Sequence, residues 1–409
     1  MDTNGSLQSI LLRFKYMPYP HDSVTLCKFI GKALTDYGIT EKTVSITTDS
    51  ASNNILAISQ MMSIVDLNKS NKFGFFHMRC FAHILHNSLK DALTRINPAL
   101  ETLRSIIKDL KKSTKKTECF MKMQLELLNH DESDNLVFAS PLKLLNEVQT
   151  RWNSTYTMLE RALVLQEAIS GAIYDFDDFR HYEEPDWEKI SKLIRLLKPI
   201  EELTRRLSSE NVPSLSLLRV FVPKIISHLG TDFRDADVNG VALGIKTELN
   251  EYRKHTENEV VELATVLDPR FKLISHPLDH YEEVIRKLQE RLDQYDGPEL
   301  NPSDSTESFF SDCFITTASS SETERYFAAP RANAKCNPLD YWNLNKNEYP
   351  KMTRLARKIL AIQATSVDSE RVLSRSGLID TDRRGRLSVQ SFESSVQMRS
   401  WLLYLDIRT

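Results

Sequence analysis

A run of about two hundred residues with helical periodicity constrains the fold of this chain more than any other feature. From residue 97 to about 295, apolar side chains recur every three or four positions. In "DHYEEVIRKLQERLDQY" one stripe contains Tyr281, Val284, Ile285, Leu288, Leu292 and Tyr295. Stripes of this kind are typical of the core faces of packed helices. Residues 97–296 are therefore predicted to form a helical domain.

The residues before this block predict a sheet with helices packed on it. "LLRFKYM" alternates apolar and basic residues, as a half-buried strand does. A helix is expected to follow with Asp22 or Ser23 as its cap, and Gly38 is expected to end it. "TVSITT", which runs into Asp49, and "FGFFHMRCF" are further strands, and "AHILHNSLKDAL" is a helix. Residues 1–96 therefore predict a mixed α/β part.

Two segments follow the helical block. Residues 297–335 are rich in Ser, Thr, Asp and Glu, and we expect them to be a disordered linker. Residues 336–409 regain periodicity, with helices expected in "SVDSERVLSRSG" and "SVQSFESSVQMRSWLLYL".

The composition predicts a soluble intracellular protein. The 5 cysteines are scattered and form no CxxC pair, which favours reduced thiols. The N-terminus lacks a signal-peptide pattern, and no apolar run reaches the ~20 residues that span a bilayer. A net charge of −3 disfavours a uniformly basic nucleic-acid coat but leaves a local basic patch open.

A metal-ligand residue type occupies every third position of one stretch, at His77, Cys80, His83 and His86. On one helix these side chains would drift round the axis and span about 13 Å. Zinc holds its ligands within about 2.3 Å, so at most two neighbours could share an ion. A zinc site is therefore disfavoured.

Asp49 stands where a strand ends and a polar loop begins. A carboxylate at this point suits metal chemistry, because the sheet holds it while solvent reaches it. The alternative is an Asx-turn residue that caps the next helix, and the local pattern favours that alternative.

Five segments, in this order, resemble one known family. They are "ITTDSASNN", "CFAHILHNSLKDAL", "TRWNSTYTML", "TVLDPRFK" and "SERVLSRSGLIDTDRRGRL", spread over residues 46–387. The chain resembles the hAT superfamily of cut-and-paste DNA transposases and the host proteins domesticated from them. The resemblance implies an RNase H-like sheet interrupted by a large helical insertion. It also implies a C-terminal dimerisation segment that completes the core.

The resemblance also implies roles for single residues. The family's second catalytic Asp falls on Asp49 and its catalytic Glu on Glu370. Its Cys-x-x-His pair, near the scissile phosphate, falls on Cys80 and His83. Its Arg-Trp pair falls on Arg151 and Trp152, and the Trp is thought to stack on a flipped base.

The chain departs from the family in its acidic residues. The first catalytic Asp, in a segment like Asp-x-Trp-Thr, is absent, and so is the BED zinc finger. In an active enzyme, either a longer N-terminus would supply that acid, or another acid such as Asp22 or Asp36 would replace it. Two Mg²⁺ ions bring +4 against −2 from Asp49 and Glu370, so the pair would be held weakly. We therefore expect no cofactor, or Mg²⁺ if the chain is catalytic, and no DNA cleavage.

Two surfaces in the C-terminal segment are candidates for binding. Basic residues gather there, at Arg354, Arg357, Lys358, Arg371, Arg375, Arg383, Arg384 and Arg386. They predict either a double-stranded DNA backbone footprint or solvated helix faces, with the second slightly favoured. A homodimer contact is expected on the last helix, at Phe392, Val396, Trp401 and Leu402.

Three functions remain open from the sequence. The first is a catalytically inactive, transposase-derived nuclear protein that dimerises and binds DNA. The second is a fragment of an active, Mg²⁺-dependent transposase. The third is a helical interaction scaffold without a nucleic-acid role.

Overall fold

The chain folds into two compact units that interleave along the sequence. The structure is a computed structural model, and it describes residues 5–64, 75–130, 140–148, 152–176, 179, 182–210, 212–293, 321–376 and 387–406. The first unit comprises Met1–Ala82, Leu207–Val220 and His255–Thr409, and the second comprises His83–Arg206 and Phe221–Lys254. The predicted helical block is thus divided, because residues 207–220 and 255–293 belong to the first unit.

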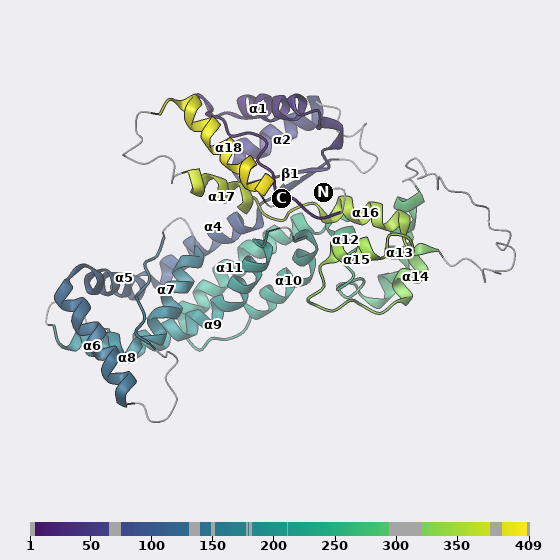
Figure 1. Cartoon of the computed structure of the whole chain (residues 1–409). Helices are drawn as coiled ribbons and strands as arrows, with labels where there is room; N and C mark the ends of the chain where they lie inside the picture. Colours follow the sequence, from purple (N-terminus) through teal and green to yellow (C-terminus); the bar gives the residue numbers. More distant parts are fainter. Residues whose placement is uncertain are drawn as a thin grey trace, which may run out of the picture. The chain divides into compact units, whose positions relative to one another are not determined.

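The N-terminal part of the first unit is built on a small sheet (Figure 1). Its elements are α1 (Ser23–Asp36), η1 (Thr40–Lys42), β1 (Ser45–Thr48), α2 (Ser52–Ile64) and β2 (Phe76–Arg79), and α4 (Phe81–Leu93) follows. Asp22 Oδ1 accepts the N–H of Thr25 at 2.8 Å, and Gly38 has φ +60°, so both predicted ends of α1 are confirmed. Leu34, Ile58, Met61 and Phe75 form the core between the helices and the sheet.

The sheet is smaller than expected. Within the described residues it has two strands, β1 and β2, which run parallel with Ser45 opposite Phe76. The expected RNase H-like sheet, truncated by the loss of its first strand, is not confirmed. The strand predicted at residues 11–17 is wrong, because this segment has no regular secondary structure. Its carbonyl groups accept hydrogen bonds from side chains instead: Leu11 O from Trp401 Nε1 and Leu12 O from Gln397 Nε2.

An aromatic cluster holds the later helices of the first unit together. These are α12 (Glu259–Val266), η3 (Leu278–His280), α13 (Tyr281–Asp293), α14 (Glu322–Ala328), α15 (Pro338–Leu344) and α16 (Pro350–Leu360). The Tyr326 ring lies 5.1 Å from Trp342 and 6.1 Å from Tyr349, centroid to centroid. Trp342 Nε1 donates to Leu267 O at 2.8 Å.

The predicted linker needs correction where the structure describes it. Residues 321–335 of this segment have a defined structure, and Ser321 caps α14 in a capping box with Glu324. Tyr326 in this helix is fully buried. The polar composition misled the prediction because one large aromatic side chain is enough to anchor a short helix.

Two helices complete the first unit, α17 (Val367–Ser376) and α18 (Val389–Asp406), as the periodicity predicted. Glu393 on α18 accepts a hydrogen bond from Lys15 Nζ at 3.0 Å, and Phe392 packs edge-on against Phe14 at 5.7 Å. The start and the end of the described chain therefore belong to one core.

The second unit is helical throughout its described part, which confirms the helical character predicted for this region. Its elements are most of α4, η2 (Thr94–Ile96), α5 (Asn97–Lys112), α6 (Thr114–His130), α7 (Trp152–Val164), α8 (Gln166–Tyr174), α9 (Glu184–Leu207), α10 (Leu215–His228) and α11 (Ala236–Thr256). His228 Nε2 lies 3.2 Å from Leu196 O, and Lys189 pairs with Asp237 at 2.6 Å, so α9 contacts both α10 and α11. No helix that the structure describes has the length and apolar character of a membrane span.

Candidate functional site at the edge of the sheet

Asp49 follows β1 directly and is half-buried. Its Oδ1 accepts the N–H of Ala51 at 2.9 Å and the side-chain amide of Asn54 at 2.7 Å. These are the hydrogen bonds of an Asx turn that leads into α2. The carboxylate therefore has a local structural role, and partial exposure leaves it open to a ligand as well.

Cys80 follows β2 and is fully buried. Its N–H donates to Thr48 O at 2.7 Å, and its Sγ accepts the N–H of Ser366 at 3.2 Å. The N–H of Phe81 donates to Ala364 O at 2.9 Å. Cys80 thus fastens the residues that precede α17 to the end of the sheet.

A second set of contacts reinforces this junction. Thr47 Oγ1 donates to Gln363 O at 2.8 Å, and Ser214 Oγ donates to Gln363 Oε1 at 2.9 Å. The Ser214 hydroxyl also accepts the N–H of Ala364 at 2.9 Å. Three segments far apart in the sequence therefore meet at the edge where the strands end.

His77 belongs to β2, as expected, and faces β1. Its Nε2 lies 2.9 Å from Thr48 Oγ1. Burial, together with the nearby positive charge of Arg79, lowers the pKa of His77. The imidazole is therefore neutral at pH 7 and serves as a hydrogen-bonding group in the sheet.

Glu370 lies in the first turn of α17 and is exposed. Its neighbour Arg371 pairs with Asp368 at 2.5 Å and with Glu210 at 3.3 Å, and it also donates to Ser208 O. The guanidinium of Arg371 is therefore already paired with carboxylates. Glu370 and Asp49 stand on elements that the Cys80 and Thr47 contacts join. In the described parts of the chain, however, no three His, Cys, Asp or Glu side chains form a group fit for a metal ion.

The other candidate residues belong to the second unit or lie outside the described residues. His83 is half-buried in α4. Trp152, the first residue of α7, is 7% exposed and lines a cavity of about 620 Å³ in the second unit. In that cavity the guanidinium of Arg104 donates two hydrogen bonds to the carboxylate of Glu147, from Nε at 2.5 Å and from Nη2 at 3.0 Å. Arg151, Arg383, Arg384 and Arg386 lie outside the described residues.

The residues expected to form a dimer contact divide between two faces of α18. Val396 is 5% exposed, and Phe392 packs on Phe14, so both face the chain's own core. Trp401 is 42% exposed although its Nε1 donates to Leu11 O at 2.8 Å, and Leu402 is 53% exposed.

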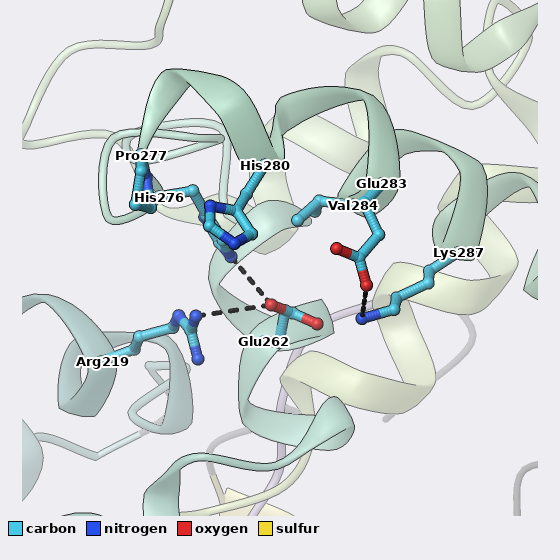
Figure 2. A pocket seen from close by; sticks show the side chains of 8 residues that line it. All are labelled: Arg219, Glu262, His276, Pro277, His280, Glu283, Val284 and Lys287. Carbon is cyan, nitrogen blue, oxygen red and sulfur yellow. Dashed lines mark hydrogen bonds and ion pairs between the residues drawn. The ribbon is translucent and has the colours of Figure 1, made fainter.

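A polar pocket of about 340 Å³ lies between α12 and α13 (Figure 2). Glu262 stands at its centre, where its Oε1 lies 3.0 Å from His276 Nε2 and 3.4 Å from Arg219 Nη2. Glu283 and Lys287 pair at 2.8 Å on the facing wall. Every charged group drawn there except His280 has an oppositely charged or hydrogen-bonding neighbour within the pocket, so this network joins helices.

Thr47, Gln363 and Ser214, which build the junction, were not predicted from the sequence. No sequence motif contains any of these residues together with the residue that it contacts. Ser214 and Ala364, for example, are 150 positions apart. Only the resemblance, which brings "SERVLSRSG" close to the sheet, offered a signal for them.

Comparison with known proteins matches three family models in chain order. Residues 1–73 match the ZBED1 RNase-like domain, and residues 78–196 match the ZBED1 RNase-like helical domain. Residues 322–402 match the hAT family C-terminal dimerisation region. The helices α14 to α18 make up the described part of this last match.

Curated relatives match almost the whole chain. A putative AC transposase of Zea mays is 24% identical over 450 residues, which cover 98% of this chain and 54% of the relative. The zinc finger BED domain-containing protein RICESLEEPER 2 of Oryza sativa subsp. japonica is 24% identical, over 99% of this chain and 62% of the relative. A putative transcriptional regulator, tpeD of Talaromyces stipitatus, is 23% identical, over 95% of this chain and 49% of the relative. The chain thus spans about half to three fifths of the length of these relatives.

Proposed function

Because this chain belongs to the hAT-type, transposase-derived proteins, we propose that it acts in the nucleus as a dimer that binds double-stranded DNA without cutting it. The observation that supports the proposed dimer is the exposed apolar end of α18, which lies within the region that matches the hAT dimerisation model. Met398, Trp401 and Leu402 are 63%, 42% and 53% exposed. Large apolar side chains that gather on one exposed helix end favour association with a second surface. A second copy of the chain is the partner that we propose.

The proposal that the chain does not cut DNA rests on charge. Asp49 and Glu370 supply two negative charges, too few to hold two divalent ions. Asp49 Oδ1 is also engaged by Ala51 and Asn54, which supports a structural use of this carboxylate.

Substitution of Leu402 tests the proposed dimer. Leu402→Asp places a charge on the exposed end of α18, where it would be buried unpaired in a dimer. We expect dimerisation to weaken by at least about tenfold, measured by sedimentation equilibrium at micromolar concentration. The far-ultraviolet circular dichroism should not change, because Leu402 is not part of the chain's own core.

Leu278→Asp is the matched control. Leu278 is 81% exposed and lies outside residues 322–402, so this variant should dimerise like the wild type. A wild-type protein that sediments as a monomer at these concentrations would refute the proposed dimer.

A further inference from the structure

A basic groove lies in the first unit, between α1, the N-terminal segment and α18. Its volume is about 630 Å³. Four basic side chains line it, Arg13, Lys15, Lys28 and Lys32, against one acidic side chain, Glu393. The lining side chains therefore carry an excess of positive charge, although the chain as a whole carries a net charge of −3.

Two of these four cations are already paired. Arg13 Nη2 lies 2.5 Å from Asp36 Oδ2, and Lys15 Nζ lies 3.0 Å from Glu393 Oε2. Glu393 also accepts the N–H of Tyr16, so the single acid of the lining is fully engaged.

Lys28 and Lys32 remain available. Both are exposed on successive turns of α1, and neither makes an ion pair with any residue that the structure describes. The Asp22 carboxylate, which feels the charge of Lys28, accepts the N–H of Thr25 as the helix cap. Residues four apart on a helix lie about 6 Å from each other at their Cβ atoms, so the two lysines stand on the same face of α1.

Hydrogen bonds between its walls build the groove. Gln397 Nε2 donates to Leu12 O at 3.0 Å and lies 3.2 Å from Tyr37 Oη. The Tyr37 hydroxyl also donates to Leu12 O. Phe14 and Phe392 pack edge to face between the same two walls. The lysines therefore stand beside a wall whose position is fixed.

We infer that this groove binds the phosphodiester backbone of DNA, through Lys28 and Lys32. The inference rests on the proposed DNA binding and assigns it to side chains other than the C-terminal arginines. The available cations are lysines, which bind phosphate as point charges. The guanidinium of Arg13, whose planar fork could bind a carboxylate or a phosphate, is occupied by Asp36, so the two lysines make the contact with the backbone.

The test measures binding of a fluorescein-labelled random-sequence duplex to the full chain by anisotropy, over a range of salt concentrations. The double variant Lys28→Gln/Lys32→Gln removes two positive charges, and glutamine is as good a helix former as lysine. Each lost phosphate contact should reduce the slope of log affinity against log salt by about 0.9, so we expect a reduction of about 1.8. The affinity at low salt should fall by about tenfold.

Lys111→Gln/Lys112→Gln is the matched control. These exposed lysines end α5 in the second unit and lie outside the groove, so the same loss of charge should leave the slope near the wild-type value. If the wild type binds DNA and the groove variant keeps the full slope, the groove assignment fails while the proposed function stands. If the wild type binds no duplex, both fail. A polyglutamate peptide that binds more tightly than DNA, with the same lysine dependence, would assign the groove to an acidic protein and overturn the inference.

Discussion

Asp49 and Cys80 each have a local structural role in the described chain. The Asp49 carboxylate closes a turn through Ala51 and Asn54. The Cys80 sulfur accepts the N–H of Ser366 and is fully buried. A motif residue that is fixed in this way keeps its neighbours in place whether or not chemistry takes place beside it.

Glu262 supplies a prediction at the same scale. A hydrogen bond from His276, opposed by partial burial and assisted by the positive charge of Arg219, lowers the pKa of Glu262 below the ordinary 4.5. A depressed carboxyl pKa means that the folded state holds its proton less tightly than the unfolded state does. The carboxylate therefore stabilises the fold above about pH 4.5, and this contribution disappears as the pH falls through the lower folded value.

Glu262→Gln tests this effect. At pH 7 we expect the free energy of unfolding to fall by about 1–2 kcal/mol, because His276 and Arg219 lose a charged acceptor. The difference from the wild type should shrink below pH 4.5 in urea titrations. An equal difference at pH 4 and pH 7 would contradict the assignment.

At the scale of elements, the segment "DPRFK" joins the helices of the first unit. Asp268 is fully buried, and Arg270 holds it with Nε at 2.9 Å and Nη2 at 2.6 Å. Ser216 Oγ on α10 donates to the same carboxylate at 2.7 Å. Lys272 Nζ donates to the backbone carbonyls of Tyr326 and, at 2.5 Å, Ala329. One short segment therefore connects α10, α12 and α14.

Lys272→Met should release α14. Burial lowers the pKa of Lys272 to about 8, so the ammonium group still predominates at pH 7. Its loss leaves two carbonyl groups without this donor and removes the cation from the Tyr326 ring, 4.4 Å away. We expect a loss of about 2–4 kcal/mol in urea unfolding.

Lys346→Met, at an exposed site, is the control and should change stability by less than about 0.5 kcal/mol. Faster hydrogen exchange at residues 322–328 in the Lys272 variant alone would localise the effect to α14. Equal stability of the two variants would show that the Lys272 contacts do not hold this helix.

At the scale of the whole molecule, the two ends of the described chain meet. Lys15 and Glu393 are 378 positions apart, and Trp401 and Leu11 are 390 apart, yet both pairs are bonded. The same convergence joins β2 to the residues before α17. The groove and the junction of the first unit therefore depend on contacts between residues far apart in the sequence.

The proposed lack of DNA cleavage is also a prediction about the whole chain. Purified protein, incubated with a labelled transposon-end duplex and Mg²⁺ or Mn²⁺, should give no nicked product on a denaturing gel. The reason is the shortage of negative charge beside Asp49 and Glu370. The Asp49→Ala variant is tested in parallel. If the wild type nicks the duplex and this variant does not, the chain is a catalyst and the prediction is wrong.

The sequence by itself determined the features that neighbouring residues decide. The bounds of α1, the helical character of the second unit and the turn at Asp49 follow from caps and periodicity, which act over a few positions. Tertiary structure decided the rest. Residues 11–17 alternate like a strand but bond to side chains of α18, and the polar segment at residue 321 becomes a helix because Tyr326 reaches an aromatic core. The groove around Lys28 exists only because α18 returns to the N-terminal segment. Local pattern cannot encode such outcomes, because each depends on which distant residue supplies the missing contact.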